Sequence, residues 1–120
     1  MPRLRLPRSA RLARNSEFER VRAEGKAEHG RYMLCSVAPC GDAGAARIGI
    51  ITSRRVGSAV ERNRVRRRFR ELVRADRSQL ATGFWVVLIA RARAVGATFA
   101  ELRDEWRRLA KRAGLLVLDA

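Results

Sequence analysis

The sequence has little of what builds metal or disulfide sites. Its 120 residues include one histidine, two cysteines and 12 acidic residues, against 27 lysines and arginines. Cys35 and Cys40 form no CxxC pair and have no histidine beside them, which argues against a zinc site or a disulfide framework. We therefore expect reduced thiols, as in a cytoplasmic protein.

Long apolar runs are absent as well. No stretch approaches the roughly 20 apolar residues that cross a bilayer, and the N-terminal segment lacks the apolar core of a secretory signal. We expect a cytoplasmic protein with no membrane partner. Residues 1–13 are basic and contain no acid; a mitochondrial transit peptide is one interpretation, but two prolines and a single serine favour a flexible arm. Residues 117–120 are predicted to form a short tail.

Motifs of protein catalysis are missing too. The chain has no P-loop, GxSxG or HExxH pattern, and its single histidine, His29, lies in a polar stretch. A protein nuclease would need a general base and, usually, carboxylates that hold a metal ion, whereas the acids here are typical of helix surfaces. We predict no catalytic residue, no metal or cofactor bound by the protein itself, and no small-molecule substrate.

Positive charge is what the sequence has in excess. The formal net charge is +15 and the isoelectric point is near 11.8, a balance that favours polyanionic partners. Two of the 27 basic residues, Lys26 and Lys111, are lysines, so 25 are arginines. Arginine grips phosphate with two parallel hydrogen bonds and stacks on bases, which favours nucleic acid, although a genome rich in G and C also raises arginine content.

Turn signals and hydrophobic periodicity predict a single α+β domain over residues 14–116. A short first helix is expected to begin at a capping box formed by Ser16 and Glu19 and to end at Gly25. Three strands are predicted next, of which the first has the weakest signal and the other two are expected to pair as a hairpin: residues 26–29, 31–37 and 47–53.

The second half of the sequence predicts two helices around one strand. A capping box of Ser58 and Glu61 opens a long helix that runs to about Arg74. Residues 84–90 form a continuous apolar run, typical of a central strand. A last helix follows a third capping box, and we expect it to pack on the sheet through Phe99, Leu102, Trp106, Leu109 and Ala113. The sum is a single-domain two-layer sandwich of helices against a small sheet.

The long helix separates two faces when its residues are placed at 100° intervals. The core face is Val65, Phe69, Leu72 and Val73, and the opposite face is Asn63, Arg66, Arg67, Arg70 and Arg74, flanked by Arg62, Arg64 and Arg68. Residues 54–74 hold nine arginines and two glutamates, so acids on the helix cannot neutralise the positive charge of this face. The phosphate groups of a nucleic acid would neutralise it. Asn63 suits a sugar or base edge, or else it braces an arginine.

The start of this helix resembles the signature of bacterial ribonuclease P proteins, whose hallmark is an RNR sequence on a long helix. The residues that carry the likeness are Gly57-x-Ala59-x-x-Arg62-Asn63-Arg64-x-x-Arg67. The likeness continues in the family's order over about residues 10–116, through residues 47–50, 84–91 and 99–102. RNR alone is a weak signal in an arginine-rich chain, whereas RNR within this order of elements is specific.

The resemblance implies the element order α-β-β-β-α-β-α, with the basic helix as a left-handed crossover between parallel strands. It also implies the function of the ribonuclease P protein subunit. That subunit binds the catalytic RNA and the 5′ leader of precursor tRNA, and assists endonucleolytic removal of the leader to generate the mature tRNA 5′ end. The protein would then be the non-catalytic subunit of an endoribonuclease, and the RNA would carry out phosphodiester cleavage, with magnesium expected for that reaction.

Matched residue by residue, the resemblance implies two sites. The RNA-facing set on the long helix is Arg62, Asn63, Arg64, Arg66, Arg67 and Arg70. The leader cleft, between the first helix and the sheet, has Phe18, Ser53, Arg54 and Arg55. A base stacked on Phe18 would contribute ~1–3 kcal/mol; the alternative is that Phe18 belongs only to the core. Aromatics of that cleft are replaced here by Arg22, Ser36 and Leu116, so charge is expected to take over, or Tyr32 if strand alternation places it there.

Three other classes of basic protein share the charge. A ribosomal protein would not predict the GxAxxRNRxxR helix between two apolar strands. A helix-turn-helix protein needs two short helices that meet at a turn, whereas strands flank this helix. A membrane-active helix needs a broad apolar face with interfacial tryptophan, and Trp85 and Trp106 lie in other elements.

Overall fold

Helices and strands follow one another in the predicted order through the residues that the structure describes, 10–40 and 44–116. In this computed structural model the helices are α1 (Asn15–Glu24), α2 (Ala59–Asp76) and α3 (Phe99–Arg112). The strands are β1 (Lys26–His29), β2 (Met33–Pro39), β3 (Arg47–Ile51) and β4 (Phe84–Ala90). Short 3-10 helices connect them: η2 (Arg54–Val56), η3 (Arg77–Gln79) and η4 (Ala92–Gly96). The weakly signalled first strand is therefore formed.

The strands form one sheet in the order β1-β2-β4-β3. β4 pairs antiparallel with β2 and parallel with β3, which confirms its central place. The predicted hairpin between β2 and β3 is wrong, because β4 lies between them. β4 is a buried apolar strand, so the backbone groups on both of its edges need hydrogen-bond partners. β2 and β3 provide these partners, and the other edge of β2 pairs with β1. α2 connects the parallel strands β3 and β4, and the left-handed sense of this crossover stays a prediction.

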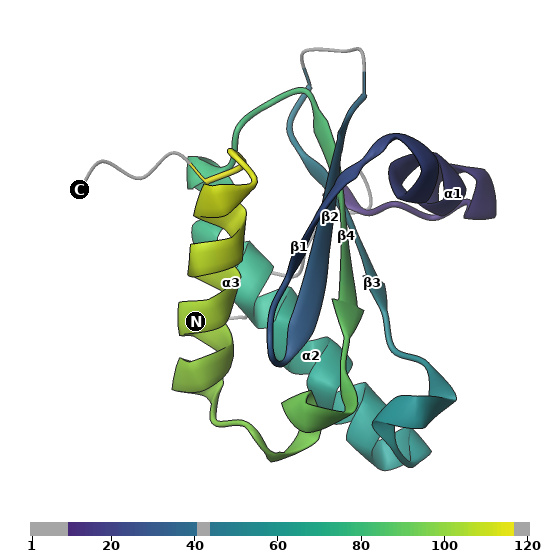
Figure 1. The fold of residues 1–120 in the computed structure, drawn as a ribbon, viewed down its shortest axis with the longest axis vertical. Helices are drawn as coiled ribbons and strands as arrows, with labels where there is room; N and C mark the ends of the chain where they lie inside the picture. The colour runs from purple at the N-terminus through teal and green to yellow at the C-terminus, as the bar shows by residue number, and fades with distance from the viewer. Residues whose placement is uncertain (1–9, 41–43, 117–120) are drawn as a thin grey trace, which may run out of the picture.

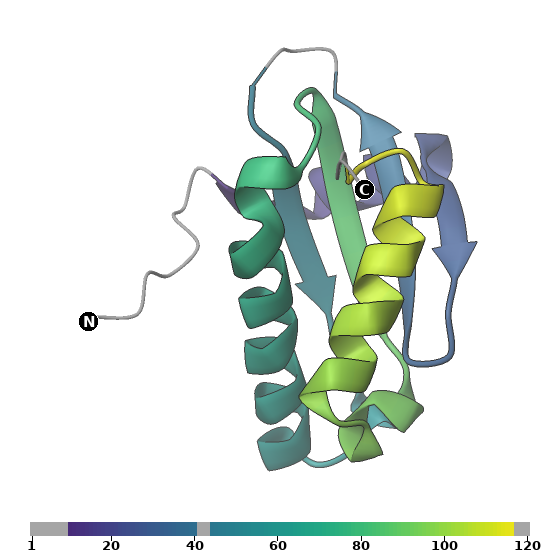
Figure 2. The same cartoon turned by 90° about the vertical axis from the view of Figure 1, so that its left-hand side faces the viewer.

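Helices cover both faces of the sheet (Figure 1). α2 and α3 lie side by side on one face with their N-terminal ends at the same end of the molecule (Figure 2), and they enclose the larger core. α1 lies on the opposite face over a smaller apolar cluster. The α+β class is confirmed. The expected two-layer arrangement describes α2, α3 and the sheet, and α1 adds a helix on the other side.

The capping boxes predicted for the two longer helices are confirmed. The Ser58 hydroxyl accepts a hydrogen bond from the Glu61 backbone N–H at 3.2 Å, and the Thr98 hydroxyl accepts one from Glu101 at 3.1 Å. Both glutamates return the contact to the N-cap N–H group. The start of each helix is therefore set by residues within one turn.

The capping box predicted for α1, between Ser16 and Glu19, is wrong. The carboxylate of Glu17 takes that role instead, and accepts the backbone N–H of the N-cap residue Arg14 at 3.0 Å. Its second oxygen pairs with Arg47 of β3 at 2.7 Å. This distant partner selects Glu17, and a local pattern contains no information about it.

The folded domain begins before residue 14. Ala10 and Leu12 are buried, and the Leu12 N–H donates to the carbonyl of Ile48 in the edge strand β3 at 2.9 Å. Residues 10–13, predicted as the end of a flexible arm, therefore pack on the sheet. The side chain of Ala10 lies in the larger core, and that of Leu12 lies in the smaller cluster under α1. Residues 1–9 and 117–120 lie outside the described residues. Within the described part, no helix has the length and apolar character of a membrane span.

A buried carboxylate fixes α3 to the turn between β1 and β2. Glu105 is 2% exposed and accepts the backbone N–H groups of Arg31, Tyr32 and Met33 at 2.6, 2.7 and 3.0 Å. Gly30 is needed beside it, since a Cβ at that position would overlap the carboxyl group. α3 is thereby held in one position along the sheet, which matters for the surface it forms with α2.

Candidate nucleic-acid interface

α2 carries the basic surface that the sequence predicts. Its core face is buried as expected, at Val65, Phe69, Leu72 and Val73. The six residues predicted to face RNA lie outside this core: Asn63, Arg64, Arg67 and Arg70 are exposed, and Arg62 and Arg66 are half-buried. One amphipathic helix therefore presents all six on the surface, because the core residues and the basic residues recur with the same helical period.

Neutral acceptors hold several guanidinium groups of this surface in place. Arg66 donates to the hydroxyl of Thr52 at 2.6 Å and to Oδ1 of Asn63 at 3.0 Å. Arg64 donates to the carbonyl of Val95 at 3.0 Å. Such bonds fix the geometry of each cation without cancelling its charge. Asn63 therefore braces an arginine, which is one of the two roles predicted for it.

The second candidate surface is a cleft of about 530 Å³ between α1 and the sheet. Its wall consists of Phe18, Glu19, Arg22, Ser36, Ile51, Ser53, Arg55, Val87 and Ile89. Three of the four residues predicted for the leader cleft are thus brought together, although they come from α1 and from the segment after β3. The fourth, Arg54, is exposed in η2 and does not line the cleft.

Phe18 owes its position to a glycine on β3. Its ring is half-buried and packs on the smaller apolar cluster. A Cβ on Gly49 would lie 2.5 Å from Cζ of Phe18, so the ring occupies the space that a side chain would fill. A glycine inside an apolar strand is typical of such a close approach. Phe18 therefore packs on the sheet and also forms part of the cleft wall, and the stacking of a base on it stays a prediction.

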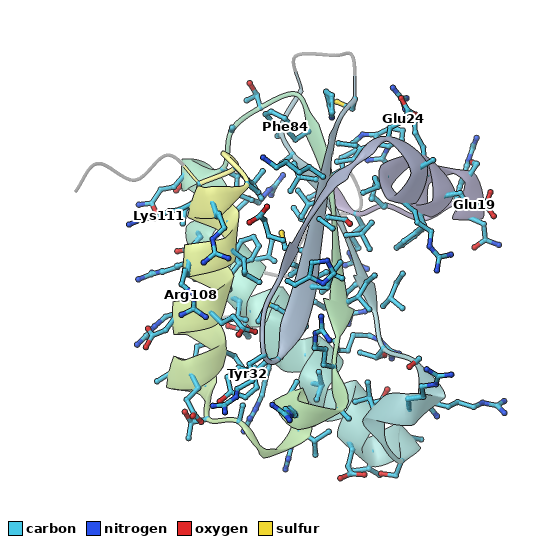
Figure 3. All side chains as sticks on the ribbon, viewed as in Figure 1. Glu19, Glu24, Tyr32, Phe84, Arg108 and Lys111 are labelled. Carbon is cyan, nitrogen blue, oxygen red and sulfur yellow. The ribbon has the colours of Figure 1, made fainter. Side chains whose placement is uncertain are left out.

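Two of the three replaced aromatic positions lie in the cleft. Arg22 and Ser36 line it, whereas Leu116 is buried in the larger core on the other face of the sheet. Tyr32 also lies on that other face, beside α3 and across the sheet from α1 (Figure 3), and its hydroxyl donates to Glu101 at 3.0 Å. Tyr32 therefore does not replace the missing aromatics. The cleft contains Phe18 together with two arginines.

Sequence reasoning missed the role of Trp85 on the α1 face. The guanidinium carbons of Arg20 and Arg47 lie 5.0 and 5.6 Å from its ring centroid, within the range of a cation–π contact. These residues come from three elements, so no local pattern joins them. The apolar wall of the cleft does have a local pattern, because Val87 and Ile89 follow Trp85 at the two-residue spacing of one strand face, but neither residue was predicted to line the cleft.

These surfaces offer cations, amide and hydroxyl groups and apolar walls. Burial raises the pKa of the Cys35 thiol to about 12, so this cysteine stays protonated near neutral pH. In the described part of the chain, no three His, Cys, Asp or Glu side chains gather in a way that could hold a metal ion. The arrangement is suited to binding a polyanion with partly unstacked bases.

Comparison with known proteins identifies the family. The model of the family described as Ribonuclease P matches residues 6–114. The chain belongs to this family. The Ribonuclease P protein component of Chloroflexus aurantiacus is 40% identical over 110 residues, covering 91% of this chain and 81% of that protein. The protein of the same name from Symbiobacterium thermophilum is 35% identical over 111 residues, covering 92% and 96%.

Solved structures share the ribonuclease P protein fold. The RNase P protein from Thermotoga maritima superposes with a TM-score of 0.77 at 28% identity, covering 85% of this chain and 96% of that one. The RNase P protein of Staphylococcus aureus has a TM-score of 0.83 at 24% identity, covering 90% and 98%. The second likeness concerns the fold alone, and it supports the order of helices and strands described above.

Proposed function

We propose that this chain is the protein subunit of ribonuclease P, a ribonucleoprotein endoribonuclease, and that it acts by binding RNA at two surfaces. The exposed face of α2 binds the RNA subunit. The cleft between α1 and the sheet binds the 5′ leader of precursor tRNA. Together they assist removal of the leader, which generates the mature tRNA 5′ end. The proposal rests on the α2 face, where hydrogen bonds to neutral oxygen atoms hold guanidinium groups in place without neutralising their positive charge.

The α2 face is suited to a folded RNA because its cations are spaced along a rigid helix. Arg64 and Arg66 are held by neutral oxygen atoms, so they lose little side-chain entropy when they bind phosphate. Each phosphate contact releases condensed counterions and makes the affinity fall with salt. The six residues Arg62, Asn63, Arg64, Arg66, Arg67 and Arg70 are the proposed contacts.

The cleft is suited to a single strand. Phe18 offers a ring on which a base stacks, for about 1–3 kcal/mol, and Arg22 and Arg55 supply cations for the adjoining phosphates. Ser53 offers a hydroxyl to a base or a ribose. Arg54, exposed next to the cleft, is placed to contact a strand that leaves it. Because Arg22 stands at an aromatic position of the family, this cleft relies more on charge.

We assign the cleavage chemistry to the RNA subunit, with magnesium as its metal ion, in the cytoplasm. The protein contributes by lowering the electrostatic repulsion between catalytic RNA and substrate. This division of labour predicts that the protein alone leaves precursor tRNA intact. It also predicts that the need for the protein is greatest at low magnesium, when fewer metal ions screen the phosphates.

The decisive experiment is reconstitution. The purified protein is mixed with a bacterial ribonuclease P RNA at low magnesium, and cleavage of precursor tRNA is followed on a gel. We expect cleavage with both components and none with either alone. In parallel gel shifts, tighter binding to duplex DNA or to anionic vesicles than to the structured RNA would overturn the proposal.

Two substitutions separate the surfaces. Arg67→Ala is expected to weaken binding to the RNA subunit and to lower the salt slope by about one, with a nearly unchanged melting temperature. Lys111→Gln, at the far end of α3 from its N-terminus (Figure 3), is the control with equal charge loss. Phe18→Ala is expected to weaken binding of leader-bearing precursor tRNA more than of mature tRNA. Equal losses for the two tRNAs would mean that Phe18 only packs.

A further inference from the structure

Phe99 departs from the pattern of its helix. It begins the apolar stripe of α3, and the next three members, Leu102, Trp106 and Leu109, are fully buried. Phe99 itself is 38% exposed. It lies in the wall of a groove between α2 and α3 with a volume of about 410 Å³, within the range of small-ligand sites. Phe99, which was predicted to pack on the sheet, therefore lies outside the core and keeps an exposed aromatic surface.

Arginines form the rest of this α2–α3 groove. Its lining residues are Arg64, Arg67, Arg68, Glu71 and Phe99. Arg64 and Arg68 are anchored by the backbone carbonyls of Val95 and Ala97, at 3.0 and 2.9 Å. These acceptors are neutral, so both cations keep their charge. The groove is thus a rigid positive frame around an exposed ring.

The remaining charges of the groove leave one guanidinium available. Arg67 is exposed, and its guanidinium group forms no hydrogen bond or ion pair with any residue that the structure describes. The carboxylate of Glu71 is bound to Arg74 at 2.8 Å, and this contact raises the pKa of Arg74. The acid of the groove is therefore engaged by a neighbour on its own helix, while Arg67 is exposed in the groove wall.

We propose that the α2–α3 groove binds one unstacked nucleotide of the RNA that α2 contacts. The base stacks on the ring of Phe99, and Arg67 binds the adjoining phosphate, with Arg64 and Arg68 framing the pocket. This inference rests on the proposed function, because the same RNA covers the α2 face. It adds a site on the opposite side of the sheet from the leader cleft, where α1 and Phe18 lie.

An apolar partner would fit this groove less well. A peptide helix or a lipid chain that covered Phe99 would also bury three guanidinium groups, at a high desolvation cost. A nucleotide supplies both requirements at once, since its base has an apolar face and its phosphate carries negative charge. Charge complementarity thus selects RNA over a protein or membrane partner.

The test measures binding to a bacterial ribonuclease P RNA by filter retention over a range of salt concentrations. Phe99→Leu keeps an apolar side chain but removes the stacking surface, so the affinity is expected to fall about 5- to 150-fold with an unchanged salt slope. Phe99→Trp is expected to retain the affinity. Arg67→Gln is expected to lower the salt slope by about one, and Lys111→Gln, on α3 outside the groove, is the control.

A second measurement does not depend on the loss of affinity. The indole in Phe99→Trp is expected to be quenched when the RNA binds, beyond the change in the wild type, whose two tryptophans are the buried Trp106 and the half-buried Trp85 on the α1 face of the sheet. Equal affinity of Phe99→Leu and wild type, or no added quenching, would overturn the groove site. If the wild type also failed to bind this RNA, the proposed function itself would be wrong. If Arg70→Gln weakened binding while Phe99→Leu did not, only the groove inference would fall.

Discussion

The contact between Phe18 and Gly49 predicts an unusual pair of mutational effects. Gly49 is buried in β3, opposite Val87 in the parallel register with β4. A Cβ there would lie 2.5 Å from Cζ of the Phe18 ring, whereas carbon atoms in ordinary contact are about 3.5–4.0 Å apart. The ring in Gly49→Ala must therefore retreat by more than about 1 Å, because Cε1 of the ring lies still closer to that Cβ than Cζ does.

The expected cost of Gly49→Ala follows from this overlap. Adding a methyl group to a packed site costs about 1–3 kcal/mol of unfolding free energy when neighbours must shift. In a Phe18→Ala background the ring is gone, so the same methyl group finds space and its cost should fall to about 0.5 kcal/mol or less. The coupling between the two positions is then about 0.5–3 kcal/mol, as for residues in direct contact.

A double-mutant cycle tests this reasoning. Urea unfolding of the wild type, both single variants and the double variant gives four free energies of unfolding and one coupling energy. An equal cost of Gly49→Ala in both backgrounds would show that β3 resists the methyl group by itself. A functional assay provides a second check: Gly49→Ala keeps the ring but moves it, so preference for leader-bearing over mature tRNA is expected to fall as it does in Phe18→Ala.

Two further predictions concern buried and acidic side chains. Glu105→Ala is expected to lower the free energy of unfolding in urea by about 3 kcal/mol or more, because three backbone N–H groups lose their acceptor. The control is Asp104→Ala at the exposed neighbour, with an expected change of about 0.5 kcal/mol or less. Similar costs for the two variants would contradict the prediction. The hydrogen bond from the Arg14 backbone, and further the contact with Arg47, lower the pKa of Glu17 below its usual 4.5. The ionised Glu17 carboxylate therefore stabilises the fold above pH 4.5, and this stabilisation is lost as the pH falls through the lowered pKa of the folded state. Unfolding midpoints of wild type and Glu17→Gln are expected to converge in acid, and parallel pH profiles would argue against this role.

Several features could be predicted because they depend on residues close together in the sequence. Ser58 and Glu61 form a capping box within one turn of α2, and the core face of that helix follows from its period. Gly114 ends α3 with φ at +75°, a conformation that favours glycine. The basic face of α2 was predictable for the same reason, and the RNR signature placed the chain in its family.

The sheet order and the start of α1 were predicted wrongly for one common reason. Each depends on which strand or side chain arrives from far along the chain. β4 displaces β3 from the edge of β2 although it follows about 45 residues after the end of β2. Glu17 displaces the expected cap because Arg47 reaches it from β3. Hydrogen-bond competition of this kind is decided after the elements have assembled.

The sequence by itself determined the element types, the chain order, the positive charge and the helix that displays it, since period and capping act over about four residues. Only the tertiary structure decided which residues share a site. It seats Phe18 on Gly49, moves Tyr32 and Leu116 to the far face, and leaves Phe99 exposed among arginines. The physical reason is that close packing joins side chains by shape, and the contacts it selects have no fixed spacing in the sequence.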